Sequence, residues 1–448
     1  MGELMGELEA QSGGSAGSAG QAVAAIWCSS ALIDGVAVAS VRLHPVDGRI
    51  ARIERGVAGG PADLRLGVVL PGAANAHSHL FHRLLRGRTH GDGGDFWSWR
   101  DRMYAEAEAL NPASYEIVAR EVFGEMLANG YTAVGEFHYL HHRPDGMPWP
   151  GEHAMEEAVV RAASVVGIRL TLLDTCYLAA GIRRPVRGAQ RGFSDGTVER
   201  WLERWHALRQ ALAGTAGPDA AAGPGTGTVT LGAALHSVRT VPRPEIAAAL
   251  AGLPADVPLH VHLSEQPQEN AECEQAYGRT PTGLLAELGA LTPRLSVVHA
   301  THLTDADVRL LGQAGVTVVL CPSTEADLGD GIGPALALAR AGARLAIGSD
   351  QNAVVDPFLE LRGVEYGQRL LSGRRGRFTP AELGTLISAD GYRSLGHRGG
   401  IAVGAWCDLV EVDAQSVRTR GSLPEQIGFA ATAADVRRVL VGGVVRSP

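Results

Sequence analysis

The stretch GVVLPGAANAHSH (67–79) is a short apolar run that ends in two histidines one residue apart. Seven further apolar runs follow it, and segments with helical periodicity separate most of them. These runs are YTAVGEFHY (131–139), IRLTLLD (168–174), TVTLGAALHSV (228–238), PLHVHLSE (258–265), LSVVHATH (295–302), VTVVLCPST (316–324) and ARLAIGSD (343–350). Eight strands that alternate with helices predict a distorted (β/α)8 barrel, an architecture of the α/β class.

Both ends of the chain have a different pattern, with short β-type runs in place of helices. Asp34-Gly35 and Asp47-Gly48 each lie between two such runs, and Asp-Gly in this position is a hairpin signal. The same pattern returns after residue 400. We therefore predict a flexible tail (1–21), a small composite β-sandwich domain formed by both termini (22–70 and 401–448), the barrel (71–400) and a low-complexity loop insertion within it (214–227).

The composition excludes several classes of partner. The 448 residues carry a net charge of −8, which argues against nucleic acid or an anionic membrane as the main partner. No window approaches the roughly 18 uninterrupted apolar residues of a membrane span. The acidic, Gly/Ser-rich N-terminal segment lacks the features of a signal peptide. Five widely spaced cysteines without a CxxC pair indicate a reducing compartment, most simply the cytoplasm.

The absence of lysine excludes three kinds of chemistry. Lys and Arg together number 40, and every one of them is arginine. The chain therefore has no P-loop lysine, no Schiff-base lysine and no carboxylated lysine that could bridge two metal ions.

The ends of the predicted strands carry residues that bind metals. Active sites of such barrels lie at the C-terminal ends of the strands, and the alternation of a strand points both His77 and His79 to the same side. Together with His262 and Asp350 they form a set of three nitrogen donors and one oxygen donor. This set suits one divalent ion, zinc first, with Fe(II) and Ni(II) as competitors. An HxH pair alone is more often structural, so the prediction depends on all of these motifs together.

Four motifs resemble the amidohydrolase superfamily. They are PGAANAHSH (71–79), HVHLSE (260–265), VVHATHL (297–303) and AIGSD (346–350). The resemblance covers nearly the whole chain from Ala24 onward. Binuclear members use a carboxylated lysine on strand four, and LGAALHSV (231–238) contains none, so a mononuclear site of the deaminase type is implied.

The resemblance also implies residues for hydrolysis at an amidine-like carbon. Asp350 would accept the proton of the attacking water, and Glu265 would donate a proton to the departing nitrogen. His299 would orient the water and stabilise the tetrahedral intermediate. Taken alone, Glu265 could equally be a solvated carboxylate at a strand end, and His299 a hydrogen-bonded core histidine.

Five longer strings are similar to the formimidoylglutamate deiminase family, which hydrolyses N-formimino-L-glutamate to N-formyl-L-glutamate and ammonia in histidine degradation. They are GDFWSWRDRMY (94–104), YTAVGEFHYLHH (131–142), HLSEQPQE (262–269), CPSTEADLGDGIGP (321–334) and EYGQRL (365–370). The family implies a homodimer and a small dicarboxylate substrate bound by Arg100, Tyr139 and Arg239. Arginine suits this role because its planar fork binds a carboxylate bidentately. Without the resemblance, ordinary salt bridges are the better interpretation of both arginines.

Two positions depart from that family. His82 stands where the reference pattern has a substrate-contacting glutamine, and Gln351-Asn352 follows Asp350 in place of the more usual Ser-His. Both changes bear on substrate preference. We keep His82 among the substrate-binding candidates, together with His236 at the end of the strand-four run.

Two alternative functions remain open. A deaminase of another small amidine, guanidine or heterocycle predicts an aromatic pocket without converging arginines. A metal-binding scaffold without catalysis is opposed by the joint presence of Glu265, His299 and Asp350. The histidines of HYLHH (138–142) also suggest a second metal site, although a polar loop over the active site is the better interpretation.

Overall fold

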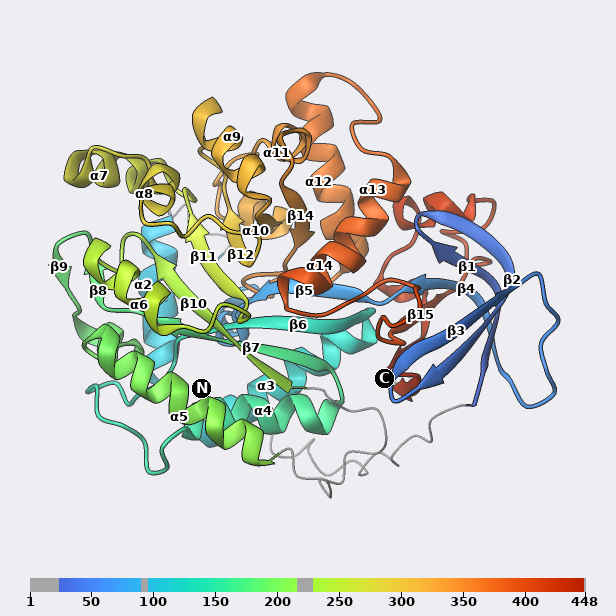
Figure 1. Ribbon diagram of the computed structural model, residues 1–448, viewed down its shortest axis with the longest axis horizontal. Coiled ribbons are helices and arrows are strands. Elements are labelled where there is room, and N and C mark those ends of the chain that lie inside the picture. Colours follow the sequence, from blue (N-terminus) through green and yellow to red (C-terminus); the bar gives the residue numbers. More distant parts are fainter. Residues whose placement is uncertain (1–23, 90–95, 216–228, 447–448) are drawn as a thin grey trace.

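The computed structural model describes residues 24–89, 96–215 and 229–446, and its central feature is the predicted barrel (Figure 1). The barrel strands, in spatial order, are β5 (Ala73–Ser78), β6 (Tyr131–His138), β7 (Arg169–Cys176), β10 (Val229–Ser237), β11 (Leu259–Leu263), β12 (Leu295–His299), β13 (Thr317–Leu320) and β14 (Arg344–Ile347). All neighbouring pairs are parallel. A further parallel bridge between Ser78 and Asp350 joins the first strand to the last, so the barrel is nearly closed. The prediction of a (β/α)8 barrel is confirmed.

Two predicted segments fall outside this description. The tail (1–21) and residues 216–227 of the predicted loop insertion do not belong to the described residues. Both remain predictions.

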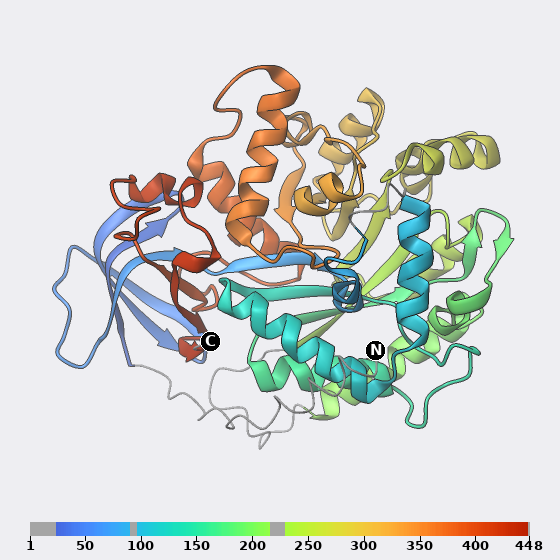
Figure 2. The ribbon, with the colours of Figure 1, turned by 180° about the vertical axis from the view of Figure 1, so that it is seen from behind.

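Helices surround the barrel (Figures 1 and 2). The longer ones are α2 (Phe96–Glu108), α3 (Pro112–Ala128), α4 (Ala154–Val166), α5 (Val198–Thr215), α6 (Arg243–Gly252), α7 (Pro267–Tyr277), α9 (Asp305–Ala314) and α12 (Pro357–Ser372). The shorter ones are η1 (Leu80–Leu85), η2 (Gly188–Phe193), α8 (Pro281–Glu287), α10 (Pro322–Asp327), α11 (Ala335–Ala341), α13 (Pro380–Thr385), η3 (Leu386–Asp390), α14 (Gly391–Ser394), η4 (Pro424–Phe429) and η5 (Ala433–Asp435). Helix α2, upright in Figure 2, contacts η1 and η2. Chain segments from three parts of the sequence therefore meet beside the barrel.

The two ends of the chain form one mixed sheet beside the barrel, as Figure 1 shows. Its strands, in spatial order, are β17 (Val444–Arg446), β16 (Val436–Val441), β15 (Leu409–Val412), β4 (Leu64–Pro71), β1 (Ile26–Ile33), β2 (Val36–Val46) and β3 (Arg49–Arg55). Asp34-Gly35 and Asp47-Gly48 have positive φ at both positions, as a two-residue hairpin turn of this type requires. The prediction that both termini build one β unit is confirmed, and its strands belong to a single connected sheet.

The first apolar run differs from its prediction because it contributes to two sheets. Strand β4 ends at Pro71 in the terminal sheet, and β5 begins at Ala73 in the barrel. Gly72 lies between them, and a Cβ atom at this position would approach Thr132 Oγ1 to 2.1 Å. Only glycine fits where the backbone passes so close to the Thr132 side chain, and this glycine lets the chain cross from one sheet to the other.

A buried ion pair joins the barrel to the terminal sheet. The side chain of Arg169 on β7 is fully buried, and its Nε and Nη2 donate to Asp408 at 3.0 and 3.1 Å. The guanidinium lies 3.6 Å from the ring centroid of Trp406, and Tyr392 donates its hydroxyl proton to Asp408 at 2.6 Å. The charge of Arg169 is thus balanced only while the two sheets stay together.

We predict that Asp408→Ala lowers the free energy of unfolding by about 3–5 kcal/mol, because it leaves the Arg169 guanidinium buried without a counter-charge. Urea unfolding followed by intrinsic fluorescence measures the change. In the control Glu157→Ala, the exposed pair with Arg161 is lost, which changes stability by less than about 1 kcal/mol. Equal effects of the two substitutions would contradict the prediction.

None of the described helices combines the length and the apolar content that a bilayer-spanning helix needs.

Candidate active site

A cavity of about 640 Å³, measured with its opening to solvent, lies at the carboxyl ends of the barrel strands. All the predicted site residues except His77 line it: His79, His82, Arg100, Tyr139, His236, Arg239, His262, Glu265, His299 and Asp350. His77 is fully buried and lies directly behind this wall. The structure therefore brings together residues from most of the barrel strands and from helix α2.

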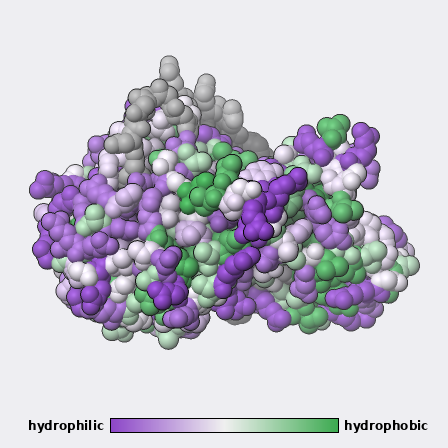
Figure 3. All heavy atoms as spheres, turned by 90° about the horizontal axis from the view of Figure 1, so that it is seen from above, coloured by the Kyte–Doolittle hydropathy of each residue, from purple (hydrophilic) through white to green (hydrophobic). Residues whose placement is uncertain are grey.

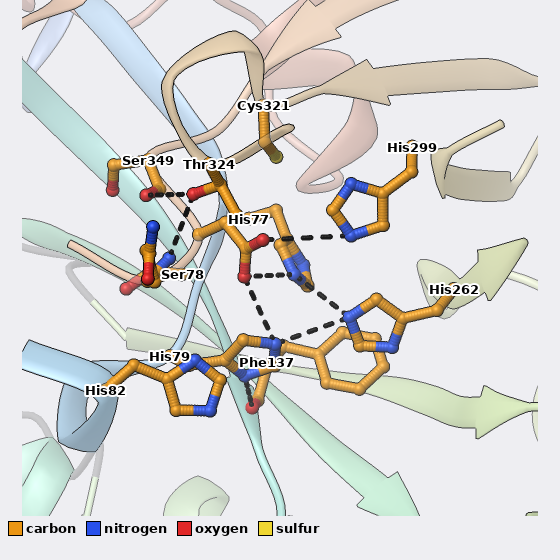
Figure 4. A network of polar contacts seen from close by, with 12 residues as sticks. His77, Ser78, His79, His82, Phe137, His262, His299, Cys321, Thr324 and Ser349 are labelled. Carbon is orange, nitrogen blue, oxygen red and sulfur yellow. Dashed lines mark hydrogen bonds and ion pairs between the residues drawn. The ribbon is translucent and has the colours of Figure 1, made fainter. Parts of the chain in front are cut away.

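Three of the predicted metal ligands, His77, His79 and His262, point toward one another (Figure 4), and the fourth, Asp350, contacts two of them. His262 Nε2 lies 3.2 Å from His77 Nε2 and 3.3 Å from His79 Nε2. Asp350 Oδ1 lies 3.4 Å from His77 Nε2 and 3.5 Å from His79 Nε2. Three ring nitrogens and a carboxylate oxygen thus face one another at short range.

Backbone carbonyl groups fix the orientation of two of these imidazoles. His79 Nδ1 donates to the Phe137 carbonyl and His262 Nδ1 donates to the His236 carbonyl, each at 2.9 Å. Burial lowers the pKa of His79 to about 3 and lowers that of His262 well below its usual value, so both rings are neutral. A neutral ring with its proton on Nδ1 presents a lone pair at Nε2. Two lone pairs and a carboxylate in contact repel one another, and a cation between them relieves this repulsion.

Backbone strain accumulates around the cavity. Ser264, His299, Ala300 and Asp350 have φ angles of 49°, 67°, 51° and 46°, a region that residues other than glycine seldom occupy. They follow or end β11, β12 and β14. Strain of this kind persists only where the surrounding structure holds it in place, and it aims these strand ends into the cavity.

His299 differs from the other histidines because carboxylates surround both of its ring nitrogens. Nδ1 lies 3.4 Å from Glu325 Oε1, and Nε2 lies 3.7 Å from both Glu265 Oε1 and Asp350 Oδ2. Burial lowers the pKa of His299, but Glu265, Glu325 and Asp350 outweigh burial and raise it to about 10. The ring therefore carries a proton on each nitrogen and can donate into the cavity.

The cationic residues lie on the cavity wall. Arg239 is largely buried, and its Nη2 lies 3.3 Å from Glu265 and its Nε 3.7 Å from Glu269. This arginine therefore forms the salt bridges that the alternative interpretation predicted. Arg100 has no acidic partner within 4 Å among the described residues, and its guanidinium lies over Trp97 and Tyr104. Among the described residues, Arg239 is therefore paired with carboxylates and Arg100 is not.

The two departures from the family pattern have different positions. His82 lines the cavity, and its Nε2 lies 2.9 Å from the Tyr139 hydroxyl. Asn352 is fully buried and donates to Ser78 Oγ and the His79 carbonyl, while Gln351 donates to Asp327. The Gln351-Asn352 change therefore supports the backbone next to His79, and only His82 faces the cavity.

Comparison with known proteins agrees with this site. The sequence profile of the Amidohydrolase family matches residues 68–446. The chain belongs to the amidohydrolase family. It is 37% identical to the formimidoylglutamate deiminase of Pseudomonas aeruginosa, with 94% of both chains covered. It is 30% identical to the 8-oxoguanine deaminase of the same species, with 85% of this chain and 82% of the relative covered.

Two solved structures share the architecture of this amidohydrolase. The amidohydrolase from Brucella melitensis superimposes with a TM-score of 0.85 at 33% identity, over 94% of both chains. An adenosine deaminase from Xanthomonas campestris with bound zinc superimposes with a TM-score of 0.79 at 25% identity, over 95% of this chain and 93% of that one. Both superpositions therefore include the barrel and the terminal sheet.

The histidines of HYLHH (138–142) do not lie over the active site, so that prediction is wrong. None of them lines the cavity that holds the predicted site residues. His141 lies 2.7 Å from Glu156 through Nδ1 and donates to the Thr175 carbonyl through Nε2 at 3.0 Å. Burial lowers the pKa of His141, but the surrounding carboxylates raise it overall. An imidazolium with both N–H groups in use has no lone pair for a metal ion.

Sequence reasoning missed several cavity residues of this amidohydrolase. Trp99, Met103 and Tyr104 line the cavity with Arg100, and their spacing places all four on one face of α2. That periodicity is a signal from which they could have been found. Other missed residues, whose positions depend on loop packing, are Tyr177 and Phe193.

Proposed function

We propose that this amidohydrolase hydrolyses the formimino C=N bond of N-formimino-L-glutamate, giving N-formyl-L-glutamate and ammonia. The observation that carries the proposal is one cavity with a metal-type cluster at its base and two arginines, Arg100 and Arg239, on its wall. A dicarboxylate with a hydrolysable C=N bond needs both features. The relative from Pseudomonas aeruginosa, named a formimidoylglutamate deiminase, supports the same substrate.

We propose that His77, His79, His262 and Asp350 hold one divalent metal ion. The donor set fits such an ion, because the lone pairs at Nε2 of His79 and His262 face each other at 3.3 Å and the Asp350 carboxylate lies 3.5 Å from His79 Nε2. Zinc suits this mixture of nitrogen and oxygen ligands best, with Fe(II) and Ni(II) as alternatives. When bound, such an ion would supply Lewis acidity that lowers the pKa of a water molecule to about 7.

The protein side chains move the protons of the proposed reaction. Asp350 takes a proton from the attacking water as the new C–O bond forms and the π bond of the C=N group opens. Glu265 delivers a proton to the nitrogen, which becomes an amino group, and Asp350 then passes the proton that it took from the water to the same nitrogen. The C–N bond breaks, ammonia leaves, and the hydroxyl of the intermediate returns its proton to Glu265 as it becomes the carbonyl. Protonated His299, 3.7 Å from both carboxylates, donates a hydrogen bond to the oxygen of the tetrahedral intermediate. Water is added and ammonia is released, so no oxidant or other co-reactant is required.

The remaining predicted residues bind the substrate. Arg100 and Arg239 pair with its two carboxylates, and Tyr139 offers a hydroxyl held by His82 at 2.9 Å. His236 forms part of the wall, with its ring 4.7 Å from that of Tyr177 and 4.9 Å from that of His262. The cavity therefore presents cations and hydroxyl groups to the dicarboxylate and carboxylates to the formimino group.

One observation favours the alternative of a heterocycle deaminase. Aromatic side chains line much of the cavity, among them Trp99, Tyr104, Tyr139, Tyr177 and Phe193. The relative named 8-oxoguanine deaminase is consistent with a flat substrate. Arg100 opposes this alternative, because a neutral ring gives its guanidinium no anionic partner, whereas Arg239 keeps Glu265 and Glu269.

We predict that the zinc-loaded protein releases ammonia from N-formimino-L-glutamate with a kcat/KM at least about a hundredfold above that for 8-oxoguanine, guanine or adenosine. The reason is that only the dicarboxylate offers a carboxylate group to each of the two arginines. A coupled ammonia assay measures all four substrates. Turnover of a heterocycle alone would establish the alternative, and no turnover of any of them would favour a catalytically silent scaffold.

We predict that Glu265→Gln lowers kcat by about two to four orders of magnitude, because an amide cannot deliver the proton to the departing nitrogen. Steady-state assays and metal analysis of the same sample measure the effect, and the variant keeps its metal ion. Glu274→Gln, on the exposed surface of α7, is the matched control and leaves kcat unchanged. A near-normal rate for Glu265→Gln would remove it from the mechanism.

We predict one divalent ion per chain by elemental analysis, and loss of most of it in His262→Ala. Removal of the ion by a chelator lowers the melting temperature, because the ion binds only the folded ligand set. His206→Ala, an exposed histidine on α5, is the control and retains the ion. Two tightly held ions per chain would contradict the proposed site.

The homodimer, the cytoplasmic location and the place in histidine degradation stay predictions. The homodimer has some support in exposed apolar residues of α12, where Tyr366 is 43% and Leu370 is 77% exposed. Figure 3 shows the molecule from the side that includes α12, with hydrophobic patches between hydrophilic ones. Such patches are commonly covered by a partner.

A further inference from the structure

Gln190 lies behind the aromatic wall of the cavity and contacts two tyrosines that line it. It belongs to η2, is 5% exposed and does not itself reach the cavity surface. Its Nε2 donates to the hydroxyl oxygens of Tyr104 and Tyr177, both at 3.0 Å. Tyr104 comes from helix α2 and Tyr177 from the segment after β7, so this one amide joins two elements.

The orientation of the Gln190 amide is set by the backbone. Its Oε1 accepts the Arg187 N–H at 3.0 Å, and a backbone N–H can only donate. The opposite edge of the amide is therefore the NH2 group, whose two protons point at the two phenol oxygens. Each phenol accepts from Gln190 and must direct its own O–H proton elsewhere.

The cavity is the direction left for those protons. Among the described residues, no carbonyl or carboxylate oxygen accepts a hydrogen bond from Tyr104 or Tyr177. Even if one phenol donates to the other, the second still has a proton for the cavity. Burial raises the pKa of Tyr177 well above its usual value despite the opposing charges of Arg100 and Arg239, so this phenol stays protonated. The tyrosine pair therefore lies near both guanidinium groups and adds O–H donors to theirs.

We propose that Gln190 is a positioning residue for substrate specificity, which holds Tyr104 and Tyr177 as hydrogen-bond donors and so selects a carboxylate over a carboxamide. The proposal rests on the proposed function, because it concerns how the same cavity recognises one end of a dicarboxylate. A carboxylate has only acceptors and satisfies every donor of this wall. A carboxamide brings an NH2 group of its own, and a donor that faces a donor in a buried site stays unsatisfied.

The decisive variant is Gln190→Glu, which keeps the shape and the bond to the Arg187 N–H. Its carboxylate oxygen accepts from both tyrosines, so their lone pairs turn toward the cavity. We expect the KM for N-formimino-L-glutamate to rise about ten- to a hundredfold with kcat within about twofold. The preference for this substrate over N-formimino-L-glutamine, measured as the ratio of kcat/KM values, should fall at least about tenfold. Gln313→Glu, on the exposed surface of α9, adds the same charge elsewhere and should change neither quantity.

A double tyrosine variant separates the effect of hydrogen-bond direction from the effect of charge. In Tyr104→Phe/Tyr177→Phe the amide has no phenols to orient, so adding Gln190→Glu should no longer change the ratio. An undiminished fall in that background would show that charge alone acts and would overturn the proposal. Gln190→Met, which removes the bonds without a charge, should give a smaller fall than Gln190→Glu and covers the case in which the charged variant does not fold.

Failure of the proposed function can be distinguished from failure of the role proposed for Gln190. If the wild-type protein does not turn over N-formimino-L-glutamate, binding of glutarate and of its monoamide glutaramate to the zinc-loaded protein still tests the wall by calorimetry. We expect the wild type to bind glutarate at least about tenfold more tightly than glutaramate, and Gln190→Glu to lose that difference. An unchanged preference in Gln190→Glu, in turnover or in binding, would overturn the role of Gln190.

Discussion

The site depends on one pair of backbone hydrogen bonds between the first and the last strand of the barrel. The Asp350 N–H donates to the His77 carbonyl at 3.0 Å, and the His79 N–H donates to the Asp350 carbonyl at 2.9 Å. Gly348 allows this approach, because a Cβ atom there would lie 2.6 Å from the His77 oxygen. The contact that closes the barrel therefore also places two histidines beside the carboxylate, so the same hydrogen bonds define the fold and assemble the site.

Burial and local charge then divide the histidines of the cavity into two kinds. Burial lowers the pKa of His79 to about 3, whereas the carboxylates around His299 outweigh burial and raise its pKa to about 10. Under the proposed function, the first ring offers a lone pair to the metal ion, and the second offers protons to the negative charge that develops in the reaction. When two groups of one type have environments that shift their pKa values in opposite directions, one cavity can offer both a lone pair and a proton at neutral pH.

The strands and their terminal residues could be predicted because both follow from local patterns. Short apolar runs between segments with helical periodicity identified all eight strands, and the alternation of side chains along a strand places Phe137 and Tyr139 on the cavity side of β6 and His138 on the other. Applied consistently, that rule would have excluded His138 from the cavity, whereas His141 and His142 lie beyond the end of β6, where the alternation no longer applies. The contacts of Arg239 with Glu269 and of Gln190 with Tyr104 could not be predicted, because they join loops and helices whose approach depends on the packed barrel.

Because the chain has no lysine, the buried cation of its cavity wall is an arginine guanidinium. Burial lowers the pKa of Arg239 less than Glu269 and Glu265 raise it, so the guanidinium keeps its charge inside the cavity wall. A lysine in the same place would lose its proton far more readily, because burial shifts the pKa of an ammonium group strongly. Arg239 contacts Glu265 at 3.3 Å while it faces the cavity. Under the proposed function, a substrate carboxylate therefore shares this guanidinium with the proton donor, and binding of the dicarboxylate is linked to the position of the acid that acts on its other end.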